Sequence, residues 1–577
     1  MNDNRNMMLA IVLSALVLIG WSFLSESVWP TSGPQTQTVE NGKVKPLPQP
    51  SADPAADSPR AIRDRAVVLA ETPRVRIETP SVNGSINLKG ARFDDLTLVR
   101  QREGLAKDSP AVRLLTPAGA RDAYFGGFGW VGQGVAAPDA NSVWTASAPV
   151  LTPAQPVTLS WTNATGQRFE QIVSVDDGYL FTIRQRVANL SPSAVGLRSY
   201  GLVSRAAKST DADGWTMHVG PMSVLNGTAD YDVNYDTLDE DRAGITRDAS
   251  SGWLGFTDKY WLTALAPANG SNFAASLKRT PSGAYQADYA GAPFIVAPGQ
   301  AVSGETHFFA GAKEKSQLDA AETRGITRLS KSIDWGWFEW FMRPIFGLLQ
   351  WLFHATGNFG VAIICLTFIV RLLMFPIADK QFRSMAGMRR VQPKMKAIQE
   401  RYKDDKPRLQ QEMLKLYQTE KINPAAGCLP ILLQIPVFYA LYKVLMVSVE
   451  MRHQPFVAWI RDLSAPDPLT PVNLFGLLDF TPPHLLAIGV LPILVGVTQW
   501  ISIKLNPQPT DPVQAQIFSI MPWVLIVVMA PFAAGLQLYW FVNNLLTIAQ
   551  QKWLYYRYDH EMTPPTEVDA VATVVKK

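Results

Sequence analysis

Long apolar runs and short alternating segments divide this chain into two unlike parts. A helix needs about 20 apolar residues to cross roughly 30 Å of hydrocarbon, so each long run is a candidate membrane span. One run lies near the N-terminus, where it predicts an uncleaved anchor or, alternatively, a cleaved signal peptide, and the others follow residue 355. The predicted spans are Met7–Leu24, Phe359–Ile377, Leu429–Val449, Leu485–Ile503, Ile517–Phe532 and Leu536–Leu554. Only a short turn separates the last two, which predicts a tight helical hairpin.

Residues 66–325 instead alternate apolar and polar positions over short segments, the pattern of half-buried strands. Clear examples are residues 74–78, 169–175 and 180–187, with an Asp-Asp-Gly hairpin signal between the last two. No helical pattern is interleaved, which favours a large β-sandwich. Residues 25–65, rich in Pro, Ser, Ala, Thr and Gln, predict a flexible tether between the first span and this domain.

The charge distribution predicts how the chain crosses the membrane. The chain as a whole has 53 basic and 49 acidic residues, a net charge of only +4. Residues 378–428 alone hold 12 Lys or Arg and 6 Asp or Glu. Basic loops stay on the cytoplasmic side, so both termini are expected inside and residues 25–355 outside. The remaining loops agree with this orientation.

Composition and missing motifs narrow the possible functions. The near-neutral charge gives no nucleic-acid signature, and the two cysteines, Cys365 and Cys428, cannot form a CxxC metal site. Neither HExxH nor a phosphate-binding GxxxxGK[ST] loop occurs, and the spans contain no pair of carboxylates. Residues 230–241 superficially resemble a calcium loop, but Thr237 and Ala243 occupy its essential Gly and Glu positions. We therefore predict a solvated loop there and no metal, cofactor or enzymatic activity.

Arg371 places a permanent charge inside the predicted span Phe359–Ile377. Insertion of an arginine there costs about 2.5–3.5 kcal/mol. One interpretation is that the guanidinium snorkels to the inner surface, about 9 Å away at 1.5 Å per residue. The other is that it faces a water-filled hollow, since no Asp or Glu lies well within another span. Amides such as Gln434 and Asn543 could line that hollow or simply join helices by hydrogen bonds.

Two amphipathic segments flank this first span of the bundle. The aromatic-rich residues 333–351 predict a helix lying in the membrane interface, or else an extension of the next span. Residues 378–428 predict a basic, Met-bearing helical hairpin with a turn at 403–407. Flexible thioethers suit varied partners, and the charge suits anionic lipid or ribosomal RNA. The alternative is an ordinary hairpin on the lipid surface.

The C-terminal half resembles the YidC/Oxa1/Alb3 family of membrane protein insertases, and most closely its Gram-negative bacterial form. The segments that carry the resemblance are residues 370–376, 388–394, 423–430, 434–442, 448–452 and 459–464. The resemblance implies a β-supersandwich for residues 66–325 in the periplasm, and a hydrophilic groove inside the five C-terminal spans. We assign to the groove Arg371, Thr367, Gln434 and Asn543. Tyr539 and Trp540 match an aromatic pair against which client helices slide.

The resemblance also implies partners and a cellular location. Hairpin residues match the region that recruits clients and ribosomes, and we assign this role to Met385, Met388, Arg389, Arg390, Met395, Lys396 and Met413. The expected partners are nascent membrane proteins, the ribosome, the SecYEG and SecDF translocon components and the lipid bilayer, but no specific DNA. The expected location is the bacterial inner membrane.

The sequence thus predicts a polytopic α-helical protein with six transmembrane helices and a large exported all-β domain. The expected division is 1–24 anchor, 25–65 tether, 66–325 β-supersandwich, 333–351 interfacial helix, 357–556 insertase core and 557–577 cytoplasmic tail. The predicted function is non-enzymatic insertion and folding of integral membrane proteins, alone or with the Sec translocon. Two alternatives stay open: a small-solute or anion transporter that uses Arg371, and a membrane-anchored periplasmic binding module.

Overall fold

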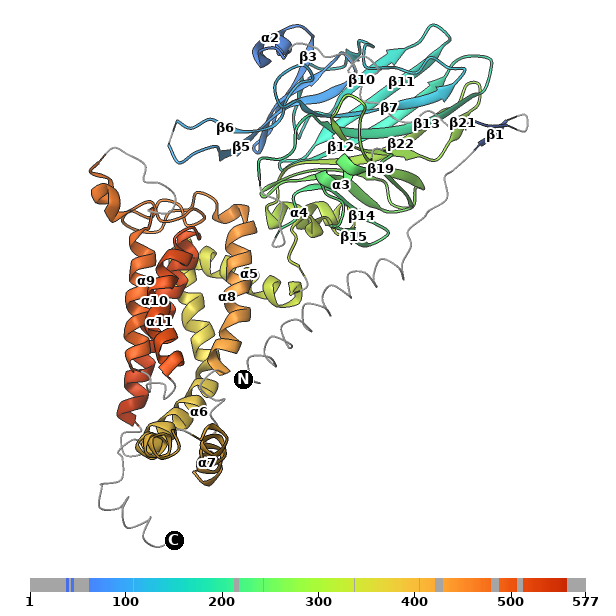
Figure 1. Cartoon of the computed structure of the whole chain (residues 1–577). Helices are drawn as coiled ribbons and strands as arrows, with labels where there is room; N and C mark the ends of the chain where they lie inside the picture. The colour runs from blue at the N-terminus through green and yellow to red at the C-terminus, as the bar shows by residue number, and fades with distance from the viewer. Residues whose placement is uncertain are drawn as a thin grey trace.

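The computed structural model describes residues 38–40, 43–45 and 62–557, apart from 107, 212–216, 242, 337, 404, 421–428, 479–486 and 506–511. In this part of the chain, an all-β domain stands at one end of a bundle of helices (Figure 1). The predicted N-terminal anchor, most of the tether and nearly all of the tail lie outside the described residues. A short pair of strands, β1 (Thr38–Glu40) and β2 (Lys43–Lys45), comes from the tether.

Two large sheets form the β domain, as the alternating pattern predicts. The nine-stranded sheet has the order β15 (Thr228–Asp230), β14 (Gly220–Leu225), β17 (Gly252–Thr257), β18 (Trp261–Pro267), β22 (Ala301–Ala312), β12 (Leu180–Asn189), β11 (Gln167–Val175), β10 (Val157–Thr162), β8 (Thr145–Ala146). The eleven-stranded sheet has the order β16 (Ile245–Ala249), β19 (Phe273–Arg279), β20 (Tyr285–Gly291), β13 (Val195–Arg205), β7 (Tyr124–Gln133), β5 (Arg92–Arg102), β4 (Val82–Asn87), β3 (Arg74–Glu78), β9 (Val150–Leu151). In addition, β6 (Ala111–Leu115) pairs with β5 and β21 (Phe294–Val296) pairs with β13.

An aromatic cluster fills the space between the two sheets. Phe93 and Phe128 come from the eleven-stranded sheet, and Phe181 and Phe308 from the nine-stranded sheet. The Phe93 ring meets the other three edge-on, with centroids 5.4–5.8 Å apart. All four side chains are buried. The large all-β domain is therefore confirmed, and the segments predicted at 74–78, 169–175 and 180–187 lie in β3, β11 and β12.

The acidic segment 230–241 is not a plain loop. It contains the short helix α3 (Tyr235–Glu240), which begins at Asn234 with a reciprocal capping box involving Thr237. The Asn234 side chain accepts a hydrogen bond from the Thr237 backbone amide at 2.9 Å. A side chain that fits a calcium loop by type thus serves as a helix cap. The described residues contain no cluster of acidic, His or Cys side chains able to hold a metal ion.

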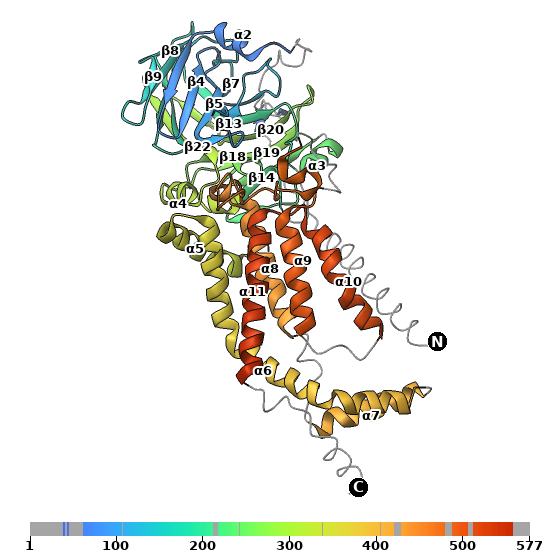
Figure 2. The same cartoon turned by 90° about the vertical axis from the view of Figure 1, so that its left-hand side faces the viewer.

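Helices connect the β domain to the bundle and form the bundle itself. Ahead of the sheets lies α2 (Arg65–Ala70), and after them α4 (Lys315–Thr323), the 3-10 turn η1 (Leu329–Ser332) and α5 (Glu339–Thr356). The bundle contains α6 (Phe359–Arg401), α8 (Leu429–Val447), α9 (Val490–Leu505), α10 (Pro512–Met529) and α11 (Ala534–Arg557), while α7 (Lys406–Thr419) lies beyond it. The short turns η3 (Val449–Met451) and η4 (Pro471–Gly476) lie between α8 and α9. Figure 2 shows the α6–α7 hairpin projecting from the end opposite the β domain.

Two of the differences from the predicted helix boundaries change how the elements are arranged. The helix predicted at residues 333–351 begins instead at Glu339, because Gly336 adopts a left-handed φ of 66° ahead of it. Helix α6 continues through residue 378 to Arg401, so the span and the first arm of the hairpin form one helix. It contains Pro376 and Pro393, and each of these removes one backbone donor from the helix.

Among the described residues, one helix is long and apolar enough to cross a membrane, Phe359–Lys380. The apolar stretches Gln434–Val447, Val490–Leu505 and Ala515–Met529 are shorter. Helix α11 has the required length, but it carries a more polar mixture of residues. The count of six membrane spans therefore stays a prediction. The predicted hairpin near the C-terminus corresponds to α10 and α11, which are joined by four residues.

Candidate functional site

Arg371 lies on α6 and faces α11, where two polar side chains receive its guanidinium. Its Nε donates to Asn543 Oδ1 at 2.7 Å, and its Nη2 donates to the Asn543 carbonyl oxygen at 3.3 Å. Nη2 also donates to the Thr547 hydroxyl. Thr547 lies one helical turn after Asn543, so both present their oxygens on one face of α11. The arginine is half-buried.

Among the described residues, no carboxylate compensates the positive charge of the Arg371 guanidinium. None of the described Asp or Glu side chains forms an ion pair with Arg371 within 4 Å. Its acceptors are an amide, a backbone carbonyl and a hydroxyl, which satisfy hydrogen bonds without cancelling charge. The sequence pattern identified Asn543 but not Thr547. Thr547 follows Asn543 by four residues, a spacing that places both side chains on one face of a helix.

A second polar contact joins α8 to α11. The Gln434 side-chain amide donates to the Tyr539 hydroxyl, and Tyr539 is almost fully buried. The neighbouring Trp540 is only half-buried, and its ring meets Phe438 edge-on with centroids 4.8 Å apart. Trp540 Nε1 also lies 3.5 Å from Gln499 Oε1. Of the predicted aromatic pair, Trp540 is therefore the member with accessible surface.

Other polar side chains of the bundle join helices, as the alternative interpretation allowed. The Asn544 amide donates to Thr498 Oγ1 at 3.1 Å and to the Val495 carbonyl at 3.3 Å. Gln537 donates to the Met529 carbonyl at 2.9 Å, across the turn between α10 and α11. Thr367 is fully buried and donates its hydroxyl to the Ile363 carbonyl of its own helix. This position does not fit the predicted role of Thr367 in lining an open groove.

The hairpin formed by α6 and α7 is described only in part. Lys396 is exposed and Met413 is half-buried, while Met395 is 4% exposed and does not present its thioether to a partner. Lys394 Nζ pairs with Glu420 Oε1 at 2.8 Å, which joins α6 to the end of α7. The side chains of Met385, Met388, Arg389 and Arg390 lie outside the described residues.

Lys443 is a second cation on a bundle helix, which the sequence analysis overlooked. It lies on α8, is 1% exposed, and its Nζ is 3.5 Å from Asp334 Oδ2. Asp334 precedes α5 and also accepts hydrogen bonds from the backbone amides of Gly336 at 2.8 Å and His218 at 3.2 Å. The two cations thus differ: Lys443 has a carboxylate partner, and Arg371 has none among the described residues.

The segment after α8 fixes the bundle to the β domain. Glu450 Oε1 accepts from the Lys315 backbone amide at 2.8 Å and from Gln350 Nε2 at 3.1 Å, and burial raises the pKa of its carboxyl. The Arg452 guanidinium stacks over the Trp261 ring 5.4 Å from its centroid. It also donates to the Glu103 carbonyl at 3.3 Å. The β domain is therefore held by specific polar contacts and not only by its connection to α5.

Comparisons with known proteins match nearly the whole chain. The model for the family described as "60Kd inner membrane protein" matches residues 351–561, and the "YidC periplasmic domain" model matches residues 74–348. A protein named membrane protein insertase YidC from Zymomonas mobilis is 48% identical, with 96% of each chain covered. A protein of the same name from Methylobacterium nodulans is 44% identical, with 96% of this chain and 95% of that one covered. A solved structure titled as an active YidC insertase is 18% identical and covers 83% of this chain and 92% of its own, with a TM-score of 0.37.

Proposed function

The chain belongs to the YidC family of membrane protein insertases, and we propose that the polar surface around Arg371 receives the polar part of a client. As a member of this family it is a membrane protein insertase of the inner membrane with a periplasmic domain, and its substrates are nascent membrane proteins. The observation that supports the site is the half-buried guanidinium of Arg371, which lies beside Asn543 and Thr547 without a carboxylate among the described residues.

The proposed mechanism lowers the cost of moving polar groups through lipid. Desolvating an unpaired amide or hydroxyl costs several kcal/mol in a medium that offers no hydrogen bonds. A hydrophilic groove that enters partway into the bilayer shortens the dry path. Arg371, with its uncompensated charge, attracts acidic or polar client tails, while Gln434 and Asn543 offer amide groups. The membrane potential assists the outward movement of negative charge, and the apolar client segment then leaves sideways into lipid.

The other parts of the chain have supporting roles in this proposal. Six spans with both termini in the cytoplasm leave residues 25–355 in the periplasm. The basic hairpin at 378–428 recruits ribosomes and nascent clients, and the SecYEG–SecDF translocon acts as a partner for some of them. Trp540, the more accessible of the aromatic pair, contacts the client helix. No covalent step is required, so the proposed activity is not enzymatic.

Depletion and complementation test the role of Arg371. Cells depleted of this protein receive the parent chain, Arg371→Ala or Arg371→Lys, and insertion of small membrane proteins with short acidic outside tails is scored. Arg371→Ala should impair these clients and Arg371→Lys should largely support them, because the ammonium keeps the charge. Arg184→Ala is the matched control, since this arginine lies on an exposed face of the β domain. Normal insertion of every client by Arg371→Ala would reject the proposed site.

Site-specific crosslinking tests the client path separately. A photoreactive residue at position 540 should capture a stalled client. The same residue at position 351 should not, because Trp351 is 64% exposed on α5, outside the bundle. Equal capture at both positions would show that the client does not follow α11.

A further inference from the structure

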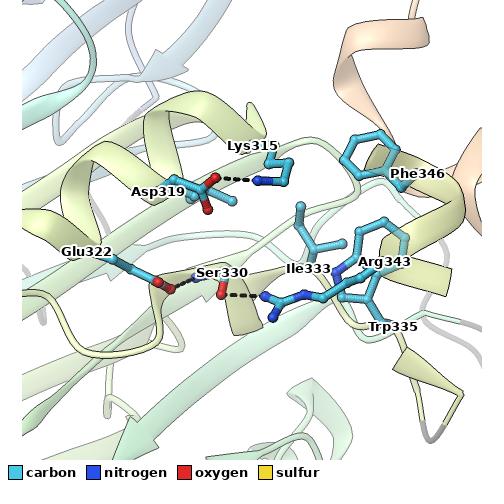
Figure 3. A pocket seen from close by; sticks show the side chains of 9 residues that line it. Lys315, Asp319, Glu322, Ser330, Ile333, Trp335, Arg343 and Phe346 are labelled. Carbon is cyan, nitrogen blue, oxygen red and sulfur yellow. Dashed lines mark hydrogen bonds and ion pairs between the residues drawn. The ribbon is translucent and has the colours of Figure 1, made fainter. Parts of the chain in front are cut away.

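A small cavity lies where the β domain meets the bundle, away from Arg371. It has a volume of about 180 Å³ and is enclosed by α4, the η1 segment and α5 (Figure 3). Its apolar wall consists of buried side chains, namely Leu318, Ile333, Trp335 and Phe346. Its polar wall consists of Lys315, Asp319, Glu322, Ser330 and Arg343. The cavity therefore combines an apolar wall with a polar wall that carries charges of both signs.

Two charged groups of the polar wall keep unused hydrogen-bonding capacity. Arg343 Nη2 donates to Ser330 Oγ at 2.6 Å and its Nε pairs with Glu339 at 3.2 Å, while its Nη1 has no partner among the described residues. Glu322 Oε1 accepts from the Ser330 amide at 2.7 Å, and its Oε2 has no described partner. Figure 3 shows Glu322 and Arg343 approaching Ser330 from opposite sides. A donor and an acceptor therefore remain free around Ser330.

Charge balance and size define the ligand that fits. Lys315 and Arg343 offset Asp319 and Glu322, so a simple anion would meet two carboxylates as well as two cations. A zwitterion with a phosphate and an ammonium group suits both signs. The cavity volume is about 180 Å³. This is below the usual range of small-molecule pockets, but it suffices for a headgroup of this kind.

The surroundings of the cavity indicate a membrane lipid as the source of that headgroup. Helix α5 exposes Trp340 and Trp351, which are 74% and 64% exposed, and tryptophans favour the membrane interface. We propose that this cavity binds the phosphoethanolamine headgroup of an outer-leaflet phospholipid. Its phosphate contacts Arg343, its ammonium contacts Glu322, and its glycerol portion contacts Phe346 and Trp335. The site is independent of the client path at Arg371.

Native mass spectrometry of the delipidated full chain tests this proposal. The protein is titrated with phosphatidylethanolamine, phosphatidylcholine, phosphatidylglycerol and the acyl-free glycerophosphoethanolamine. One phosphatidylethanolamine should bind about tenfold more tightly than the others, because only it offers a phosphate, an N–H donor and an apolar tail. Arg343→Gln should remove most of this affinity. Glu322→Gln should abolish the preference over phosphatidylcholine and phosphatidylglycerol.

Matched control variants test whether reduced lipid binding comes from a general loss of surface charge or from unfolding. Arg324→Gln and Glu305→Gln remove surface charges that form ion pairs outside the cavity, and should leave lipid binding unchanged. Thermal unfolding of each variant shows that it is folded. Equal binding of phosphatidylglycerol, or parental binding by folded Arg343→Gln and Glu322→Gln, would overturn the site. Equally tight binding of glycerophosphoethanolamine would overturn its assignment to a lipid.

Discussion

Some buried cations of the β domain are paired with carboxylates, whereas Arg371 in the helical bundle is not paired with any of the described ones. In the β domain, Arg205 pairs with Asp258 at 2.8 Å, and Lys278 pairs with Asp288 at 3.0 Å. In the bundle, Arg371 has only uncharged acceptors among the described residues. A buried ion pair offsets the desolvation of each charge. The charge of Arg371 is not balanced in this way among the described residues, which supports its proposed role in attracting a polar part of the client.

At the boundary between the two regions, the buried cation Lys443 is paired with a carboxylate, as Arg205 and Lys278 are in the β domain. Lys443 belongs to a bundle helix, but it lies beside Asp334 from the segment that precedes α5. Where a carboxylate from the domain side is within reach, the cation is paired. Arg371 has no such carboxylate partner among the described residues. We propose that the lack of a carboxylate beside Arg371 among the described residues leaves its charge available to the client.

The largest effect is expected in the aromatic core of the β domain. Phe308 is fully buried and contacts Phe93, Phe128 and Phe181. Phe308→Ala should lower the free energy of unfolding by about 3–5 kcal/mol, because it removes buried area and leaves a cavity. Thermal unfolding of the full chain, followed by the strand signal in circular dichroism, measures the change. An unaltered midpoint would contradict the packing described here.

Breaking a buried ion pair of the β domain should lower the free energy of unfolding nearly as much as Phe308→Ala. Asp258→Ala leaves Arg205 without its carboxylate and should lower stability by about 3–5 kcal/mol. The matched surface change is Glu305→Ala, whose partner Arg184 has a side chain that is 58% exposed. That change should cost about 0–1 kcal/mol. Equal losses for the two variants, compared by thermal unfolding, would remove the distinction between buried and exposed pairs.

Lys313 is an exception in the β domain, because its buried ammonium forms no ion pair with a carboxylate among the described residues, and it makes the stability of the domain depend on pH. Its Nζ donates to Thr257 Oγ1 at 3.0 Å and to the Ser332 carbonyl at 3.3 Å, and burial lowers its pKa from 10.5 to about 8. Between these values the unfolded chain holds a proton that the folded chain has released. Stability should therefore rise from pH 8 to pH 10.5, by about 3 kcal/mol. Lys313→Met should reduce this rise, as unfolding midpoints against pH will show; identical profiles for both proteins would contradict it.

The smallest of these effects is expected at the acceptors of Arg371. Asn543→Leu removes the side-chain acceptor of the guanidinium and should cost about 1.5–3 kcal/mol, the range for hydrogen bonds to charged groups. Client insertion should also decrease, because the guanidinium loses the partner that orients it. Asn544→Leu is the comparison, since Asn544 bonds only Val495 and Thr498. If it lowers insertion as much at equal stability, the orientation of Arg371 is not the cause.

Local sequence patterns predicted much of the architecture. The period-two alternation identified β3, β11 and β12, and the apolar runs identified the helices of the bundle, because both patterns depend on which residues face a core. The charge within the run at Phe359–Ile377 also singled out Arg371 without any knowledge of its neighbours. Each of these features lies within a short stretch of chain. Over such a stretch, backbone geometry and hydrophobicity already limit which secondary structure forms and which side chains face a core.

Only the tertiary structure decided which polar groups meet. Arg371 and Asn543 are 172 residues apart, and Glu450 bonds the Lys315 amide 135 residues away. The packing of helices and the docking of the β domain bring these groups together, and no local period encodes that arrangement. The same reason explains why Thr547, Lys443 and the cavity beside α5 were missed. The sequence by itself determined where the charges and apolar faces lie, whereas long-range packing determined which of them are satisfied.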